Sequence, residues 1–281
     1  MKSADTIVED IYGVLTKGAD IHKEDIDAFG SAVAKIVDER LNQEREHRPL
    51  RLSSIGEKCD RKTWFRANTP ELAEPLQPWT RLKFLYGDII EALLLFLARA
   101  AGHKVSGEQD TIEIGGVKGH RDGVLDGRII DVKSASTYGF KKFASNGLRG
   151  EDPFGYLSQI GSYSYGSRDD LSVTERDVHS FLAMDKSLGH LVLDTYPVDD
   201  TDYEAKVQHQ KDVIAQNKPP KPYYFPEPEG KSGNLKLGTE CSYCCFKRTC
   251  WSGLRSFAYS TGPVHLVKVV KEPKVPEILP E

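Results

Sequence analysis

Residues 119–136 read GHRDGVLDGRIIDVKSAS, and this stretch decides the fold. The Asp-Gly pair at 126–127, set between two apolar segments, is a strong signal for a two-residue β-hairpin turn. Asp122 then lies on the first strand, and Asp131 and Lys133 lie on the second. Because alternate residues of a strand point to the same face, Asp131 and Lys133 share one face of the sheet. The sequence therefore predicts a hairpin that gathers two carboxylates and a lysine.

Two carboxylates brought together in this way form a hard-oxygen site suited to Mg²⁺ or Mn²⁺. Such an ion can activate water and stabilise the charge that develops on a phosphate during hydrolysis. A neighbouring lysine can hold the attacking water or neutralise that charge. The alternative is an exposed hairpin with a surface ion pair, since Asp and Lys two apart on a strand are common. Asp122, Asp131 and Lys133 alone leave both interpretations open.

Two segments that flank the hairpin carry polar residues four apart, on one face of a predicted helix. The upstream segment FLYGDIIEALLLFL holds Gly87, which would allow close approach of another backbone, and Glu91, which interrupts an apolar pattern. A carboxylate there must be paired, exposed or bound to metal. The downstream segment FGYLSQIGSYSYG holds Gln159 and Tyr163, which are suited to touching a DNA backbone or holding the lysine. Taken alone, each pair is better explained as an ordinary polar helix face.

The cysteines form a second candidate site. Four of the five lie within ten residues of one another near the end of the chain. An intracellular protein rarely uses such a cluster for disulfides, so metal binding is favoured. Four thiolates can hold a 4Fe–4S cluster or a Zn²⁺ ion. The five are Cys59, Cys241, Cys244, Cys245 and Cys250.

Composition indicates an ordinary globular protein. Hydrophobic residues make up 39% of the 281, enough for a core of normal size. The longest apolar run, Ala92–Ala98, is far shorter than the roughly 18 residues that a membrane span needs. The N-terminus lacks a basic segment followed by an apolar stretch, so we expect no secretory signal and no membrane partner. The expected location is the cytoplasm, or the host cytoplasm if the protein is phage-encoded.

The net charge of −4 does not by itself indicate a nucleic-acid-binding protein. Its distribution is more informative: residues 133–149 hold four basic residues and no acid, and residues 231–250 hold four against one acid. Such stretches can form a groove that tracks phosphates, although solvated loops explain them equally well. The candidate DNA-binding residues, including one that follows the first cysteine, are Arg61, Lys141, Lys142, Arg149, Lys247 and Arg248.

The order of predicted elements suggests a single α/β or α+β domain. A short helix carrying Cys59 would begin at Ser53 or Ser54. Residues 217–240, rich in Pro, Gly and Lys, are expected to form a loop. The predicted helices cover 6–16, 24–45, 79–101, 137–145, 154–165 and 201–216. The predicted strands lie near 103–114, 117–125, 128–135, 177–185 and 190–197.

The motifs occur in an order that resembles a known family. G-x₃-E, then D, then D-x-K, then Q-x₃-Y, over about residues 80–165, resembles the RecB-like branch of the PD-(D/E)xK nucleases. The resemblance implies a restriction-endonuclease-like α/β fold, with a central mixed sheet flanked by helices. It implies that Asp122 and Asp131 bind the metal and that Lys133 positions the nucleophilic water. Gln159 and Tyr163 would support the site and the DNA.

Glu91 is the departure from the RecB-like pattern. Many members of that branch have histidine there, whereas lambda-type phage exonucleases carry a glutamate. A third carboxylate ligand makes the metal site harder and favours Mg²⁺. The metal preference and the subfamily therefore do not transfer from the resemblance.

The cysteine order, one before the nuclease motifs and three after them, resembles the four-cysteine arrangement of AddB-type helicase-nucleases and CRISPR-adaptation nucleases. That resemblance implies a 4Fe–4S cluster held by Cys59, Cys241, Cys244 and Cys250, with Cys245 left over and Zn²⁺ as the alternative. Joining positions 59 and 250 would close a very long loop, so the cluster would act as a structural staple.

These resemblances predict a metal-dependent DNA nuclease with three parts. Residues 1–48 would be a helical N-terminal extension, 49–260 the nuclease domain with its iron–sulfur staple, and 261–281 a tail. We expect an exonuclease that processes linear duplex or single-stranded DNA ends in recombination, repair or phage DNA metabolism, with a recombination or single-strand-annealing protein as a possible partner. A CRISPR-adaptation nuclease and a non-catalytic DNA-binding subunit of a larger complex are the alternatives. A phosphate-binding P-loop motif is absent, so no helicase activity is expected.

Overall fold

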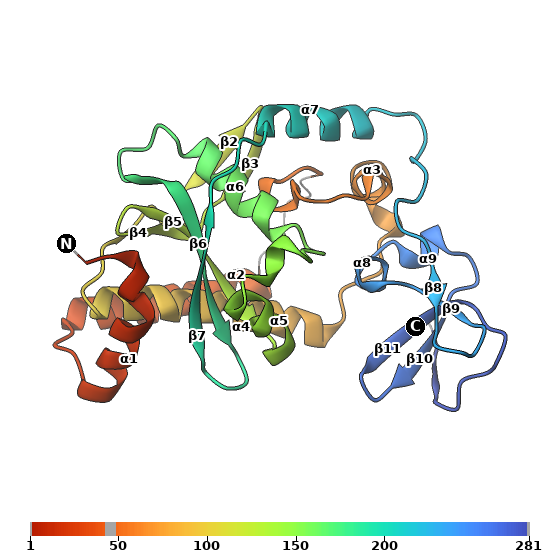
Figure 1. Cartoon of the computed structure of the whole chain (residues 1–281), viewed down its shortest axis with the longest axis horizontal. Helices are drawn as coiled ribbons and strands as arrows, with labels where there is room; N and C mark the ends of the chain where they lie inside the picture. The colour runs from red at the N-terminus through yellow and green to blue at the C-terminus, as the bar shows by residue number, and fades with distance from the viewer. Residues whose placement is uncertain (1, 43–48, 280–281) are drawn as a thin grey trace. The chain divides into compact units, whose positions relative to one another are not determined.

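The computed structural model describes residues 2–42 and 49–279 (Figure 1). The chain forms two compact units. Unit 1 comprises Met1–Gly56 and Gln77–Val207, and unit 2 comprises Glu57–Leu76 and Gln208–Glu281. This division differs from the predicted parts, because the segment around Cys59 belongs with the C-terminal residues.

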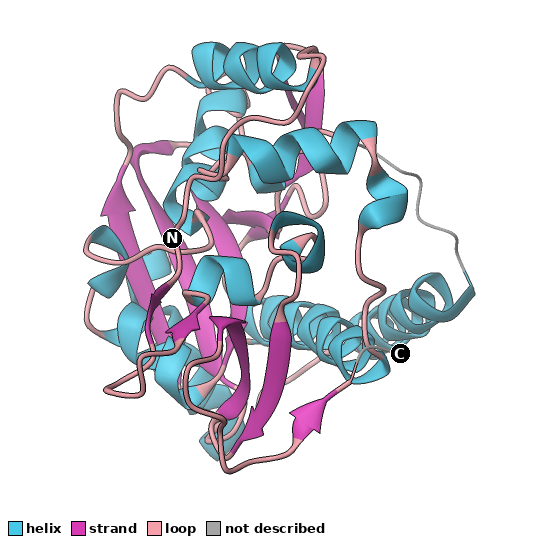
Figure 2. Ribbon diagram, turned by 90° about the vertical axis from the view of Figure 1, so that its right-hand side faces the viewer, coloured by secondary structure: helices cyan, strands magenta, loops and turns pink. Residues whose placement is uncertain are grey.

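The centre of unit 1 is a five-stranded mixed sheet with the strand order β1-β4-β5-β6-β7. Figure 1 labels β4, β5, β6 and β7 of this sheet, and Figure 2 draws the strands of the chain in magenta. Strands β5 and β6 are parallel, and every other neighbouring pair is antiparallel. A fold that combines helices with a mixed sheet was expected, and it is what the structure has. The strands are β1 (Val105–Ser106), β4 (Gly123–Leu125), β5 (Arg128–Ala135), β6 (Glu175–Asp185) and β7 (Leu191–Pro197).

Alternate residues of the central strands pack into two separate apolar clusters. Ile129 and Phe181 belong to a cluster that includes residues of α5 (Thr137–Ala144) and α6 (Tyr156–Gly166). Their neighbours Ile130 and Leu182 belong to a cluster that also contains residues of two N-terminal helices, α1 (Ile7–Lys17) and α4 (Pro78–Ala100). Burial of both strand faces explains why β5 is apolar at consecutive positions.

The N-terminal helices belong to this architecture. The second cluster includes Ala4, Ile7 and Ile11, all fully buried, so the start of the predicted extension contributes to the core of unit 1. Helix α2 (Lys23–Asn42) packs against α4. The last residues of the helix predicted over 24–45 lie outside the described part of the chain. The short 3₁₀ turns of unit 1 are Ala4–Thr6, Leu52–Ser54 and Gly147–Arg149.

Two tight hairpin turns fix the register of the β region. The turn at 126–127 has φ angles of 51° at Asp126 and 97° at Gly127, and the turn at Gly115 and Gly116 has 52° and 79°. Positive φ at both central residues is the geometry that two-residue hairpins favour, and it confirms both predicted turns. The second turn joins β2 (Thr111–Ile114) to β3 (Val117–His120).

Unit 2 contains an antiparallel sheet that the sequence did not predict, with the order β12-β10-β11-β9-β8. Its small core holds Trp64, Phe65, Val213, Cys244 and Phe246. The strands are β8 (Glu227–Pro228), β9 (Leu235–Lys236), β10 (Arg255–Tyr259), β11 (Gly262–Lys268) and β12 (Glu277–Ile278). The helical pieces are α3 (Asp60–Asn68), a 3₁₀ turn (Pro70–Leu72), α8 (Thr239–Ser242) and α9 (Lys247–Cys250), while α7 (Tyr203–Ile214) is divided between the units.

Three local expectations differ from the structure. Cys59 does not lie within a helix that begins at Ser53 or Ser54; it is the residue immediately before α3. The stretch 261–281 contains two strands rather than a tail alone. Among the described residues, and apart from its chain neighbours and the backbone of its own helix, no atom lies within 4 Å of a Cβ built on Gly87, so this glycine does not serve the close backbone approach that we expected.

Candidate active site

The β4–β5 hairpin places Asp122 and Asp131 opposite each other. Gly123 pairs with Ile130, so the residues just beyond this pair face each other across the two strands. The Asp122 carboxylate accepts a hydrogen bond of 2.7 Å from the backbone N–H of Val132. The side chain thus replaces a strand hydrogen bond, and this contact fixes its position beside β5.

Asp131 has an unusual environment for a carboxylate. It is completely buried, and neither of its oxygens accepts a hydrogen bond of acceptable geometry within the described residues. The ammonium group of Lys133 is a close neighbour and forms an ion pair with it. Lys133 also lies over the ring of Tyr156, 4.9 Å from the centroid. A buried carboxylate with unused lone pairs is costly unless a cation or a donor satisfies it, so the site suits a metal ion.

Glu91 on α4 completes a set of three carboxylates. It accepts a hydrogen bond of 2.7 Å from the side-chain amide of Gln109. Burial raises the pKa of Glu91 to about 7, and the nearby charges of Asp131 and Asp88 add to this effect. Burial also raises the pKa of Asp122 well above its usual value, with contributions from Asp131 and Glu91. These three carboxylates are therefore close enough to influence one another's ionisation.

Gln159 and Tyr163 are brought together as predicted. The Gln159 amide donates to the Tyr163 hydroxyl at 3.2 Å, along one face of α6. Tyr163 is buried, and burial raises the pKa of its hydroxyl, with smaller contributions from Asp131 and Asp122. Gly119 makes room for this ring, because a Cβ there would lie 3.0 Å from a ring carbon of Tyr163.

A glycine pair positions the start of α6. Gly155 precedes the helix with φ of 72°, and a Cβ on Gly56 would lie 2.6 Å from the Gly155 backbone. The two backbones are therefore in direct contact. This contact fixes where the first turn of α6 begins, at Tyr156, three residues before Gln159.

Two residues of the site were missed from the sequence. Gln109 has φ of 54°, a left-handed conformation that is uncommon outside glycine, and it reaches Glu91 from the loop between β1 and β2. Arg121 is almost fully buried and donates to Asp110 at 2.9 Å and also to Asp170. Because Arg121 directly precedes Asp122, its bond to Asp110 links the loop that carries Gln109 to the segment that carries Asp122. Arg121 lies between β3 and β4 and is flanked by His120 and Asp122, so no apolar pattern in the sequence marked it as buried.

A cavity of about 480 Å³ opens beside Glu91. Residues of α2, including Lys35 and Arg40, line one side of it, and Gln109 lines another. Arg40 is held there by two hydrogen bonds to Asp88, one of them 2.6 Å long. The N-terminal helices therefore border the carboxylate site.

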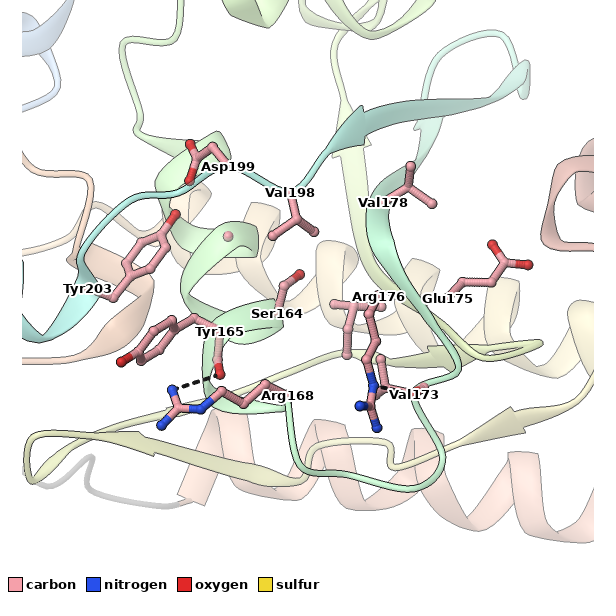
Figure 3. Close-up of a pocket in the computed structure, with 12 residues that line it drawn as sticks. Ser164, Tyr165, Arg168, Val173, Glu175, Arg176, Val178, Val198, Asp199 and Tyr203 are labelled. Atoms are coloured by element: carbon pink, nitrogen blue, oxygen red, sulfur yellow. Dashed lines mark hydrogen bonds between the residues drawn. The ribbon is translucent and has the colours of Figure 1, made fainter.

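A separate cavity of about 170 Å³ lies at the other end of α6, between Tyr165, Arg168 and Tyr203 (Figure 3). Arg168 lies over the Tyr165 ring, 4.2 Å from its centroid. None of the predicted site residues lines this cavity, so it does not belong to the candidate active site.

All five cysteines lie in unit 2. Burial raises the pKa of Cys241 to about 11, and the thiols of Cys59 and Cys250 add to this rise. Burial likewise raises the pKa of Cys244 to about 12, with smaller contributions from Cys245 and Cys250. Cys59, Cys241 and Cys250 thus influence one another, and Cys244 is influenced by Cys245 and Cys250.

The fifth cysteine, Cys245, is not one of the four predicted ligands. Its charged neighbours are Arg66, Lys62 and Lys247, which act against the rise in pKa that burial causes. Lys62 acts in the same direction on Cys244, so basic neighbours do not separate Cys245 from the predicted ligands.

The candidate DNA-binding residues of unit 1 lie on and beyond α5. Lys141 is exposed, and Lys142 pairs with Glu151 at 2.9 Å. Arg149 lies over the ring of Tyr196, 5.6 Å from its centroid. Lys141 has the most accessible charge of the three.

The candidate DNA-binding residues of unit 2 make internal contacts. Arg61 donates to the carbonyl oxygen of Pro220 at 2.7 Å. Lys247 pairs with Glu74 at 2.6 Å, and the backbone N–H of Arg248 also donates to Glu74. These side chains stabilise unit 2, which leaves less of their charge for a phosphate.

Neither site is closed around a metal position. Over residues 2–42 and 49–279, no three His, Cys, Asp or Glu side chains are grouped so that they could hold an ion as they stand. The carboxylates and the thiols are gathered, and binding would require them to move closer together. Across the same residues, no helix is long and apolar enough to cross a membrane.

Comparisons with known proteins give no family. No family model matches the chain, and no curated protein matches it. A solved structure titled "Crystal structure of SSO0001" is similar at 15% sequence identity and a TM-score of 0.41. That similarity covers 79% of this chain and 96% of the other.

Proposed function

We propose that the protein is a metal-dependent DNA nuclease with a restriction-endonuclease-like PD-(D/E)xK fold, acting on DNA ends as an exonuclease in recombination, repair or phage DNA metabolism. The observation that carries this proposal is the fully buried Asp131, placed beside Asp122, Glu91 and Lys133. Its oxygens accept no well-formed hydrogen bond from the part of the chain that the structure describes. Lys133 offsets only part of the cost of placing three acidic groups together, and a divalent ion would offset more of it.

The residues of the site would have two roles, metal binding and orientation of the attacking water. Asp122, Asp131 and Glu91 would hold Mg²⁺ or Mn²⁺ through their oxygens. When bound, such an ion provides a nucleophilic water at neutral pH and stabilises negative charge on the phosphate. Lys133, held by Asp131 and by the Tyr156 ring, would orient that water.

The residues around these ligands would keep them in place. The Gln109 amide holds one Glu91 oxygen and leaves the other available. The Gln159–Tyr163 hydrogen bond presents a hydroxyl close to the carboxylates, where it could donate to a phosphate oxygen.

Cys59, Cys241, Cys244 and Cys250 would hold a 4Fe–4S cluster, a proposal supported by the presence of all four thiols in unit 2 and by the influence that several of them have on one another. Cys59 precedes α3, whereas the other three lie more than 180 residues later. A cluster would therefore join the two segments of unit 2. A Zn²⁺ ion would use the same ligands, and measured iron and zinc contents distinguish the two.

Digestion of end-labelled DNA tests the nuclease proposal. Linear duplex, single-stranded and circular DNA are incubated with anaerobically purified protein and Mg²⁺ or Mn²⁺. We expect the native protein to degrade linear DNA and Lys133→Ala to do so roughly 10²–10³-fold more slowly. Lys118→Ala, which removes a surface lysine paired with Glu113, should have the native rate.

Two results would contradict the proposal. One is equal cleavage by the native protein and Lys133→Ala, which would indicate a contaminating nuclease. The other is the absence of cleavage of every substrate while the protein retains its metal, which would favour a DNA-binding subunit.

A further inference from the structure

The segment from Lys218 to Phe225 connects α7 to β8 (Figure 1). One face of this segment is exposed. Exposure alternates along it: Lys221, Tyr223 and Phe225 are exposed, and the residues between them are partly buried. This is the period of an extended chain, in which every second side chain points the same way. Tyr223 is 57% exposed and Phe225 is 73% exposed.

The segment is held rigid although it has little secondary structure. Prolines at 219, 220, 222 and 226 restrict its backbone. The carbonyl oxygen of Pro220 accepts a hydrogen bond from Arg61, and the backbone N–H of Tyr223 donates to the Cys59 thiol. Just before it, the indole of Trp64 donates to the carbonyl oxygen of Gln216 at 2.7 Å. Rigid aromatic side chains lose little entropy when they bind a partner.

The charge near these aromatic rings favours an anionic partner. Lys58, Lys218 and Lys221 are exposed on or next to the segment and its contact with Cys59. Two of the nearby acids are already paired, Glu57 with Lys62 at 2.6 Å and Glu227 with Lys236 at 3.2 Å. Positive charge interleaved with exposed rings is the combination that binds single-stranded nucleic acid, by stacking on bases and by contact with phosphates.

We infer that Tyr223 and Phe225, with Lys218, Lys221 and Lys58, form a binding surface for single-stranded DNA on unit 2. We call it the aromatic platform. It takes no part in hydrolysis, and it deepens the proposed nuclease function by assigning a strand-binding surface to the cysteine-containing unit. The platform favours single strands over duplex, because the bases of a duplex are already stacked on each other.

Fluorescence anisotropy with a labelled oligothymidine of about 15 nucleotides tests the platform. The full-length protein carries Lys133→Ala, so that cleavage does not consume the probe. We expect Tyr223→Ala and Phe225→Ala each to weaken binding roughly tenfold. The combined change of the three lysines to glutamine should reduce the slope of log Kd against log salt by about 2. A hairpin duplex should bind more weakly and should respond less to the aromatic changes.

Matched variants separate base stacking from general apolar contact. Tyr223→Trp and Phe225→Trp should retain binding, since tryptophan also stacks on bases, whereas Tyr223→Leu and Phe225→Leu should not. Val270→Ala removes an apolar side chain of unit 2 that is 61% exposed, and it should bind as the parent does. All these side chains are exposed, so the variants should keep the parent's melting temperature and metal content.

Unchanged binding of the single strand by the Ala variants overturns the inference, as does full rescue by leucine. A change in self-association by sedimentation, with DNA binding unaffected, would instead assign this surface to a second copy of the chain and would also overturn it. The result does not depend on cleavage. Failure of the nuclease proposal would appear in the digestion assay, and failure of the platform would appear only in binding.

Discussion

Units 1 and 2 are stabilised by different means. Unit 1 buries two large apolar clusters, one on each face of its sheet, and its predicted site residues rest on them. Unit 2 has a small cluster, and a predicted metal ligand, Cys244, is part of it. Apolar burial alone can therefore stabilise the fold of unit 1. A small unit with so little core usually needs a staple, and here the thiols are the available one.

The difference extends to how each site is held. In unit 1 hydrogen bonds from the Val132 N–H and the Gln109 amide orient Asp122 and Glu91, and only a small further approach is needed to bind an ion. In unit 2 the two chain segments meet through contacts such as the 2.7 Å hydrogen bond from the Glu74 N–H to the Cys245 carbonyl, together with the thiols. We therefore expect metal loss to inactivate unit 1 without unfolding it, and to unfold unit 2.

The largest expected effect comes from Cys59→Ser. This change removes the one predicted ligand from the first segment of unit 2, and it should lower the stability of that unit by roughly 3 kcal/mol or more because metal binding and folding are coupled. Hydrogen exchange should show loss of protection in β10 and β11 and native protection in β5 and β6. Cys245→Ser is the control and should keep the native metal content. Equal loss of protection in both units would show that the two are not independently stabilised.

A smaller effect, confined to unit 1, is expected from Arg121→Met. The change removes a buried guanidinium that bonds Asp110 and Asp170, both partly exposed, so the cost should be about 2–3 kcal/mol rather than that of a fully buried pair. The Gln109 loop would loosen, and affinity for Mn²⁺ should fall. Chemical denaturation and metal titration measure the two effects. Arg168→Met, which alters a partly exposed arginine, should change neither the stability nor the affinity for Mn²⁺. A native metal affinity in Arg121→Met would contradict the positioning role of Arg121.

The smallest effect concerns pH. Burial lowers the pKa of His179 in β6 to about 4, and its ring nitrogen Nδ1 lies 3.0 Å from the Ser164 hydroxyl. In the unfolded chain His179 becomes protonated near pH 6.5, whereas in the folded unit it stays neutral until about pH 4. The stability that unit 1 gains from keeping His179 neutral is therefore fully present above pH 6.5. It decreases as the pH falls towards 4, by up to about 2 kcal/mol at pH 5.

His179→Asn should make the stability of unit 1 less dependent on pH between about 7.5 and 5. Urea denaturation at several pH values, followed by a probe in unit 1, gives the comparison. His209→Asn is the control, because that side chain is 61% exposed. An unchanged pH dependence in His179→Asn would mean that other groups dominate acid unfolding.

The sequence predicted unit 1 far better than unit 2, for physical reasons. Long periodic segments such as α4 and β6, and turns that require positive φ, carry local signals. The strands β8, β9 and β12 have two residues each, too few for any alternation to be seen. Two pairs of this sheet, β8–β9 and β10–β11, are local, but β9 pairs with β11 and β10 with β12 across longer stretches of chain, and no local pattern predicts those pairings.

The candidate site shows the same limit. Asp122, Asp131, Lys133 and the Gln159–Tyr163 pair follow from strand and helix spacing. The hydrogen bond from Gln109 to Glu91 depends on a left-handed residue in a loop, and the role of Arg121 depends on a contact with Asp170 across 49 residues. Both are consequences of the folded chain rather than of any local segment.

The glycine pair at 56 and 155 has a consequence for how this chain tolerates mutation. Gly56 is the last residue of its segment in unit 1, and a scan of substitutions would class it as remote from any chemistry. Yet any side chain there would press on the Gly155 backbone and shift the first turn of α6. Even alanine should therefore be selected against at both positions. Because each glycine lies against the backbone of the other, no second substitution at the partner position could make room for a side chain.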